Sequence, residues 1–273
     1  MNYVVATPPE GSHMFLARRF DERDVTARDE PVAIEMPVAL LFAGRSFAVM
    51  LATPTDLADF ARGFALTEGV VEDFDEIGAV DVRRLERGVE VRVEIPTDRA
   101  LALDGRRRSL VGRTGCGLCG VDRFSEALRP VAAVEGNGVV TPAALRRAVG
   151  ELPRHQILNA RVGSVHAAAF ADETGEILLA REDVGRHNAL DKLIGALRVR
   201  SIDTARGFVL VSSRCSYEMV HKTASAGIGL ISAVSAPTSL AVELAEKVRV
   251  GLVGYAREGR FTVYARPERI AEV

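Results

Sequence analysis

The sequence predicts an α/β protein, with a layered core around a mostly parallel sheet and a smaller N-terminal α+β part. Three observations support this prediction. Strand-like and helix-like apolar patterns alternate from about residue 160 onward, which is typical of α/β layers. Before residue 105, strand patterns surround a single helical pattern instead. With 273 residues, of which 48% are hydrophobic, the chain can bury a substantial core.

The first segment is not expected to belong to the fold. Gly11-Ser12-His13-Met14 resembles the scar that an expression vector leaves, so we predict that residues 1–14 are a tag or disordered. The N-terminal α+β part then spans residues 15–105.

Within this part, two apolar runs on either side of Gly44 predict two strands joined by a turn. The stretch from Thr53 to Asp56 is a helix start signal, and apolar residues follow it at near-helical spacing through Leu66. Apolar and charged residues alternate from Val89 to Ile95, the pattern of a half-buried strand.

A segment at residues 106–135 separates this part from the core. It contains glycine at 112, 115, 117 and 120, which disfavours both helix and strand, so we predict a mobile loop. The core occupies residues 136–273 and begins with a helix at Thr141-Pro142.

The core contains the alternating elements in order. The patterns predict strands at 165–170, 176–180, 208–212 and 230–234, helices at 183–197, 217–227 and 239–250, and a final strand pair at 252–255 and 261–265. Strands separated by helices predict the mostly parallel sheet.

Composition restricts the class of protein. The net charge of -2 gives no reason to expect a nucleic-acid partner. Three cysteines indicate a reducing compartment rather than a disulfide framework. We see neither a membrane span nor an export signal, and therefore expect a cytoplasmic protein without a membrane partner.

The first motif with chemical potential is the pair Cys116 and Cys119 in the glycine-rich loop. A C-x-x-C pair can exchange sulfur, form a disulfide or share a metal. A structural zinc site needs four ligands, and the sequence offers no second such pair. A redox pair of the thioredoxin type would follow a βαβ pattern, which is absent upstream. A persulfide carrier needs an exposed thiol on a mobile loop, and fits best, but spacing alone does not decide among the three.

Three further segments place polar residues where ligands bind. Residues 181–192 and 212–219 each follow a predicted strand and open a helix, where free backbone N–H groups favour anions. For residues 181–192 the alternative is an ordinary solvated first helical turn, but the density of Asp, Arg, His and Asn favours a ligand site. For residues 212–219 the alternative is that Cys215 is a buried small apolar residue. Residues 255–260 combine a tyrosine with two arginines at a turn, which could stack a base and hold phosphates, or form an ordinary hairpin.

Taken together, these segments resemble the formate dehydrogenase accessory sulfurtransferase family, FdhD. The resemblance runs in order from about residue 30 to 270, and its motifs lie at 52–54, 63–69, 115–120, 165–169, 182–192, 212–219 and 235–239. Each motif alone is weak, whereas the set is specific.

The resemblance implies a function. Members of the family accept sulfur from a cysteine desulfurase as a persulfide and deliver it to the bis-molybdopterin guanine dinucleotide cofactor that formate dehydrogenase requires. By position, Cys116 is the persulfide cysteine and Cys119 its partner. The family also implies a homodimer. An alternative is a non-catalytic molybdenum cofactor chaperone, and another is a zinc-dependent nucleotide hydrolase.

We expect the cofactor to bind where the polar segments converge. The family's cofactor-binding stretch falls on Tyr255, Ala256, Arg257, Glu258, Gly259 and Arg260. The strand-to-helix segments add Asp183, Arg186, His187, Ser213, Arg214 and Ser216.

The family further implies a cytidine deaminase-like core. His187 and Cys215 then fall near the places of zinc ligands, but the sequence lacks the accompanying Glu and second Cys. We therefore expect no metal site in the protein itself.

Overall fold

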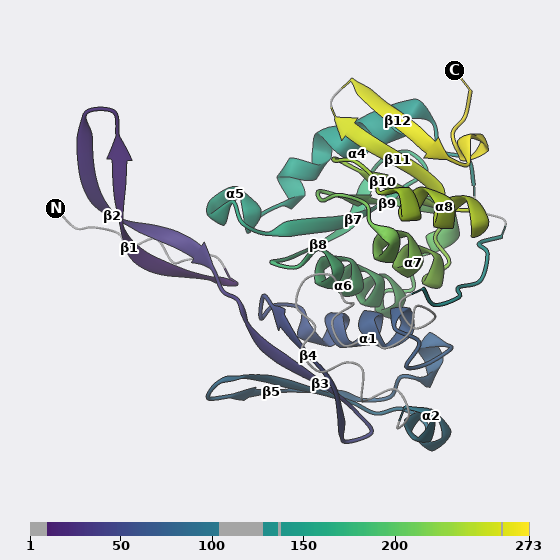
Figure 1. Cartoon of the computed structure of the whole chain (residues 1–273), viewed down its shortest axis with the longest axis horizontal. Coiled ribbons are helices and arrows are strands. Elements are labelled where there is room, and N and C mark those ends of the chain that lie inside the picture. The colour runs from purple at the N-terminus through teal and green to yellow at the C-terminus, as the bar shows by residue number, and fades with distance from the viewer. Residues whose placement is uncertain (1–9, 104–127, 136–137, 258, 273) are drawn as a thin grey trace.

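The computed structural model describes residues 10–103, 128–135, 138–257 and 259–272. Within these residues the strands form three sheets, of two, four and six strands. Figure 1 shows the six-stranded sheet and the four-stranded sheet as separate layers, with helices α1 and α6 between them.

The N-terminal sheet has the order β4-β3-β6-β5 and carries α1 on one side. Its elements are β3 (Met36–Phe42), β4 (Arg45–Ala52), α1 (Leu57–Thr67), β5 (Val80–Leu85), β6 (Gly88–Val93) and α2 (Thr97–Ala102). The predicted strands around Gly44, the helix after Asp56 and the strand near 89–95 are confirmed. β5 and α2 are additions that the sequence patterns do not predict.

The six-stranded sheet has the order β12-β11-β10-β9-β7-β8. Its strands are β7 (His166–Asp172), β8 (Ile177–Asp183), β9 (Gly207–Val211), β10 (Leu230–Ala233), β11 (Gly251–Arg257) and β12 (Arg260–Ala265). Helices α6 (Arg186–Val199), α7 (Tyr217–Ser225) and α8 (Ser239–Lys247) pack in the core on one face, and α4 (Pro142–His155) packs on the other. The short helix α5 (Asn159–Val162) follows α4. The layered α/β core is therefore present.

The prediction of a mostly parallel sheet is wrong, because the sheet is mixed. β10 pairs parallel with β9 and β11, whereas the β7–β8, β7–β9 and β11–β12 pairs are antiparallel. A parallel pair needs a crossover of a dozen or more residues, and only the turn around Gly175 separates β7 from β8. The cytidine deaminase-like layering stays a prediction.

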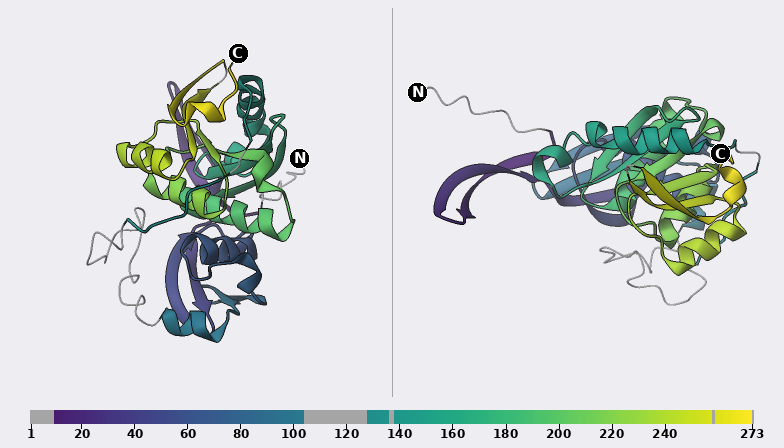
Figure 2. Two further views of the ribbon diagram at one scale, coloured as in Figure 1. Left: turned by 90° about the vertical axis from the view of Figure 1, so that its right-hand side faces the viewer. Right: turned by 90° about the horizontal axis from the view of Figure 1, so that it is seen from above.

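The exclusion of residues 1–14 from the fold is corrected for residues 12–14. They begin β1 (Ser12–Asp21), which pairs antiparallel with β2 (Asp24–Ala33) from Ser12 opposite Ala33 onward. At the base of this hairpin, the carbonyl of Gly11 accepts the Ile34 N–H at 2.8 Å. The hairpin projects away from the layered parts (Figures 1 and 2).

Helices α1 and α6 pack backbone to backbone. A Cβ on Gly63 would lie 1.9 Å from the carbonyl oxygen of Asp191, and one on Gly195 would lie 2.0 Å from that of Asp59. Only glycine permits this approach, which fixes the N-terminal sheet against the core. Among the described residues, no helix is long and apolar enough to cross a membrane.

Candidate functional site

The polar segments predicted as ligand-binding lie in a row at the ends of the strands of the six-stranded sheet. We call this row of strand ends the edge of the sheet, as distinct from its outermost strands. The strand directions put the carboxyl ends of β8, β9, β10 and β11 at this edge, together with the amino end of β7. His166 is paired with Asp183, and Val211 with Ala233. The edge is the part of an open α/β sheet where ligands bind.

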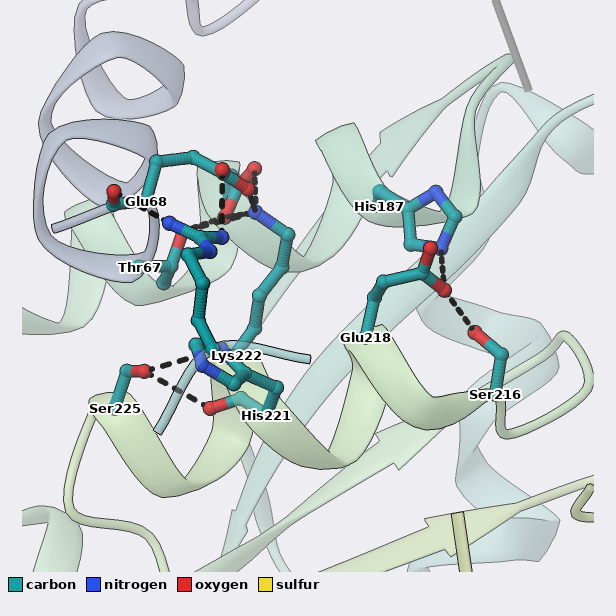
Figure 3. A network of polar contacts seen from close by, with 10 residues as sticks. Thr67, Glu68, His187, Ser216, Glu218, His221, Lys222 and Ser225 are labelled. Carbon is teal, nitrogen blue, oxygen red and sulfur yellow. Dashed lines mark hydrogen bonds and ion pairs between the residues drawn. The ribbon is translucent and has the colours of Figure 1, made fainter. Parts of the chain in front are cut away.

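At one end of this edge, the first turns of α6 and α7 meet. His187 lies in the first turn of α6, which begins after Gly185, and Ser216 is the residue before α7. Glu218 Oε2 accepts the Ser216 hydroxyl at 2.9 Å and lies 3.4 Å from His187 Nε2 (Figure 3). Burial by itself raises the pKa of Glu218, but its contacts with His187 and Ser216 outweigh burial and lower that pKa below its usual value. The two helix starts thus place an imidazole and a carboxylate side by side at this end of the sheet.

Positive charge gathers beside this pair. Burial lowers the pKa of the half-buried His166, and the neighbouring Arg186 and His187 lower it further. The Arg186 Nε atom is buried and has no hydrogen-bond partner among the described residues. A buried N–H without an acceptor is costly, so an anionic ligand that supplies one would be favoured here.

Asp183 has a different role from the one predicted. Its carboxylate is fully buried, 2.7 Å from Lys192 Nζ, and accepts N–H bonds from Thr53 at 3.0 Å and Asn188 at 2.9 Å. Lys192 Nζ also donates to the Thr53 carbonyl at 2.9 Å. These bonds join the N-terminal part to the core, and they argue against the direct cofactor contact predicted for Asp183.

The segment after β9 divides between surface and core. Arg214 is exposed and free to meet a ligand, whereas Ser213 is buried and donates to the Arg214 carbonyl at 2.9 Å. Cys215 is fully buried, and burial raises the pKa of its thiol to about 12. The prediction of a buried, apolar role for Cys215 is confirmed.

The hairpin of β11 and β12 lies farther along the same edge. Tyr255 is exposed, has a positive φ of 51°, and donates its N–H to the Ser235 carbonyl at 3.0 Å. Arg257 and Arg260 are also exposed and directly paired, and Gly259 takes the positive φ of the turn. The side chain of Ala256 is buried in the core, and Glu258 lies outside the described residues.

The structure thus brings His187, Ser216 and Arg186 together and leaves the tyrosine–arginine hairpin apart. Four strand spacings separate β8 from β11, which is about 19 Å at 4.8 Å each. An extended ligand could span this distance, whereas a small anion would occupy only one end. Cys116 and Cys119 lie outside the described residues.

A second polar cluster lies next to this site and is absent from the predicted set. Lys222 Nζ, on α7, donates to Glu68 at 2.8 Å, Asp191 at 2.9 Å and Thr67 at 2.9 Å (Figure 3). Arg129 donates to the Glu68 carboxylate at 2.7 Å, and its own carbonyl accepts the Tyr217 hydroxyl at 3.1 Å. We call Thr67, Glu68, Arg129, Asp191 and Lys222 the buried ionic cluster.

Opposing effects set the charges of this cluster. Burial raises the pKa of Glu68, but the charges of Lys222 and Arg129 outweigh it and hold that pKa well below its usual range. Burial keeps the pKa of Asp191 above its usual value, although Lys222 opposes the shift. Burial lowers the pKa of Lys222, and the two carboxylates outweigh it, so that the lysine stays charged.

Sequence reasoning also missed His166 and Glu218. Both belong to segments that support the family resemblance. His166 begins β7 and Glu218 lies in the first turn of α7, and these positions next to strand ends are the signal that could have identified them. In the part of the chain that the structure describes, no group of three His, Cys, Asp or Glu side chains could hold a metal ion.

Comparisons with known proteins agree on one family. The FdhD/NarQ family matches residues 33–271. The chain is 50% identical over 244 residues to the sulfur carrier protein FdhD of Bordetella bronchiseptica, covering 89% of this chain and 88% of that one. It is 46% identical over 265 residues to the protein of the same name from Cupriavidus necator, with 97% and 92% covered. Its structure resembles that of a formate dehydrogenase accessory protein from Desulfotalea psychrophila, with a TM-score of 0.73, 26% identity, and 95% and 99% of the two chains covered.

Proposed function

The chain belongs to the FdhD/NarQ family, and from this premise we propose that it is a cytoplasmic sulfur carrier that serves formate dehydrogenase. It accepts sulfur from a cysteine desulfurase on Cys116 and delivers it to the bis-molybdopterin guanine dinucleotide cofactor. The cofactor is the substrate of this transfer rather than a resident group.

The loading step is a thiolate exchange. The Cys116 thiolate attacks the terminal sulfur of the desulfurase persulfide, so that the S–S bond to the desulfurase cysteine breaks and that cysteine leaves as a thiolate. Cys116 then carries the sulfur as its own persulfide.

For release, the Cys119 thiolate attacks the Cys116 sulfur. A Cys116–Cys119 disulfide forms and hydrosulfide leaves toward the cofactor. The sulfane sulfur is reduced by two electrons and the cysteine pair is oxidised, so a dithiol reductant must restore the pair before another cycle.

The observation that best supports cofactor binding is the buried Nε of Arg186, which has no hydrogen-bond partner among the described residues and lies beside His166 and His187. This end of the sheet edge suits a phosphate, because a guanidinium offers charge-assisted hydrogen bonds to phosphate oxygens. Arg214 and the exposed Arg257 and Arg260 continue the positive charge toward Tyr255, whose ring could stack on the guanine. The residues therefore fit a long ligand that carries several negative charges.

The test is the intact mass after incubation with a cysteine desulfurase, cysteine and pyridoxal phosphate. Wild type should gain one sulfur, about 32 Da, and Cys116→Ala should gain none. Cys215→Ala is the matched control and should still gain sulfur, because Cys215 is buried. If wild type gains no sulfur, or if Cys116→Ala still activates formate dehydrogenase, the non-catalytic chaperone becomes the better account.

A further inference from the structure

Thr53 joins the N-terminal part to the turn between β8 and α6. It follows β4 directly and is fully buried. Its hydroxyl oxygen Oγ1 accepts the N–H of Val184 at 3.2 Å, and its own N–H donates to the Asp183 carboxylate at 3.0 Å. Its carbonyl accepts Lys192 Nζ at 2.9 Å. All three polar groups of Thr53 therefore contact residues of the core.

The turn depends on these contacts for its backbone hydrogen bonds. The residue before α6 is Gly185, which has no side chain to cap the helix. Its N–H donates instead to Asp183 Oδ1 at 2.8 Å, and the preceding N–H of Val184 uses the Thr53 hydroxyl. A partly buried N–H that loses its acceptor is costly, so removal of the hydroxyl would favour a different conformation of the turn.

This turn leads directly into the candidate site. Arg186 is the first residue of α6, and His187 is the second. The buried Nε of Arg186 has no hydrogen-bond partner among the described residues, and the proposed function assigns it to a phosphate of the cofactor. Only Gly185 separates Arg186 from Val184, so a shift of the turn moves the guanidinium. Thr53 itself cannot touch a ligand, because its side chain is fully buried.

We propose that Thr53 is a positioning residue for the cofactor site. Its hydroxyl holds the turn between β8 and α6 in the conformation that presents the Arg186 guanidinium to a phosphate. The proposal rests on the proposed function, because it takes Arg186 as a ligand of the cofactor. The N-terminal part then contributes to cofactor binding without contacting the cofactor.

The test is the dissociation constant of guanosine diphosphate, measured by calorimetric titration of the full chain. This probe carries the guanine and the phosphates of the nucleotide part of the cofactor. Thr53→Val keeps the shape of the side chain, removes the hydroxyl, and should weaken binding about five- to ten-fold, because the Val184 N–H loses its acceptor. Thr53→Ser keeps the hydroxyl and should bind within about two-fold of wild type.

Thr223→Val is the matched control. Thr223 is also fully buried, and its hydroxyl donates to the Met219 carbonyl at 2.7 Å, within α7 and away from the turn. This variant should bind the nucleotide within about two-fold of wild type. Urea unfolding of both valine variants measures what each change costs in stability. Equal weakening of nucleotide binding by the two variants would show a general loss of stability and would overturn the proposal.

A double-mutant cycle tests whether Thr53 acts through Arg186. In the background of Arg186→Met, Thr53→Val should change the dissociation constant by less than about two-fold, because the guanidinium that it displaces is already absent. The same five- to ten-fold weakening in both backgrounds would overturn the proposal, since Thr53 would then act independently of Arg186. Thr53→Ala replaces Thr53→Val in the cycle if circular dichroism shows that the valine variant is unfolded.

Sulfur loading separates this proposal from the proposed function. Thr53→Val should gain one sulfur as wild type does, because loading uses Cys116. If Thr53→Val binds the nucleotide as tightly as wild type, the positioning role is refuted and the sulfur-carrier function stands. If wild type gains no sulfur, the carrier function fails, and the nucleotide affinities still decide the role of Thr53. If wild type binds no nucleotide at about 1 mM, the cofactor site and the role of Thr53 are refuted together.

Discussion

Replacing Lys222 by methionine should be among the most destabilising single changes in the protein. Its ammonium group is buried and donates to Thr67, Glu68 and both oxygens of Asp191, at 2.8–3.0 Å. Methionine has a similar volume, so little of the effect comes from a cavity. The change leaves two buried carboxylates. Among the described residues, Glu68 keeps its bond from Arg129, whereas Asp191 keeps the bond from the Thr67 hydroxyl. Removing one partner of a buried ion pair costs about 3–5 kcal/mol, which is a large part of the stability of an ordinary domain.

Urea unfolding followed by circular dichroism measures this loss as a difference in the free energy of unfolding. Lys247→Met is the matched control, because Lys247 is exposed on α8, and it should change stability by less than about 0.5 kcal/mol. Adding Asp191→Asn to Lys222→Met should restore part of the lost free energy of unfolding, because it removes the carboxylate that is left with the weaker partner. This double variant can still be measured if the single variant does not fold. A loss below about 1 kcal/mol for Lys222→Met would refute the claim that the buried ionic cluster holds α1, α6 and α7 together.

Two further predictions concern the same region. Burial lowers the pKa of His221 to about 4, and the charges of Arg129 and Lys222 contribute to the shift. Between pH 6.5 and 4 the unfolded chain therefore binds a proton that the folded chain does not. The free energy of unfolding must fall as the pH falls through this window. The free energy of unfolding should fall by about 2–3 kcal/mol from pH 7 to 4.5 on account of His221. Urea unfolding of His221→Leu at the two pH values should lack this contribution. The same pH dependence in wild type and His221→Leu would contradict the prediction. Gly63→Ala should lower the free energy of unfolding by about 1–3 kcal/mol or more, and with it the melting temperature, because the new methyl group meets the Asp191 carbonyl. Gly150→Ala in α4, where a Cβ meets nothing within 4 Å, should instead stabilise the protein by up to about 1 kcal/mol. If Gly63→Ala stabilised the protein as well, helix propensity would outweigh the close packing of α1 against α6.

Local patterns predict the elements whose apolar faces are regular. The alternation in β6 and the spacing of Leu57, Phe60 and Phe64 in α1 each reflect one buried face, and both predictions are confirmed. The two edge strands β5 and β2 carry few buried side chains, so no periodicity marks them. Strand direction is also invisible in composition, because β7 and β8 read as buried strands whether they run parallel or antiparallel. Only the short turn at Gly175 indicates their direction.

The candidate site was predictable where function depends on position at a strand end. His187 and Ser216 follow β8 and β9, and the sheet brings them to one edge. Asp183 shows the limit of this reasoning. It also lies at a strand end, yet its carboxylate is buried in contacts with Lys192 and Thr53. Whether Asp183 meets a ligand or stays in the ion pair with Lys192 depends in part on its contact with Thr53, which lies 130 positions away in the sequence. A single sequence does not contain those contacts in any local pattern.

Helix α7 connects the two polar regions of the protein. Glu218 and Lys222 are four residues apart on it and therefore project from the same side. Glu218 contacts His187 at the start of α6, and Lys222 contacts Asp191 on α6 and Glu68 at the end of α1. The rotation of α7 that satisfies Lys222 is thus the rotation that presents Glu218 to His187. Because the buried ionic cluster has few geometries in which all its charges are paired, it restrains the histidine–carboxylate pair more tightly than apolar packing would. The ions of the cluster accordingly contribute to the geometry of the site, although none of them is expected to touch the cofactor.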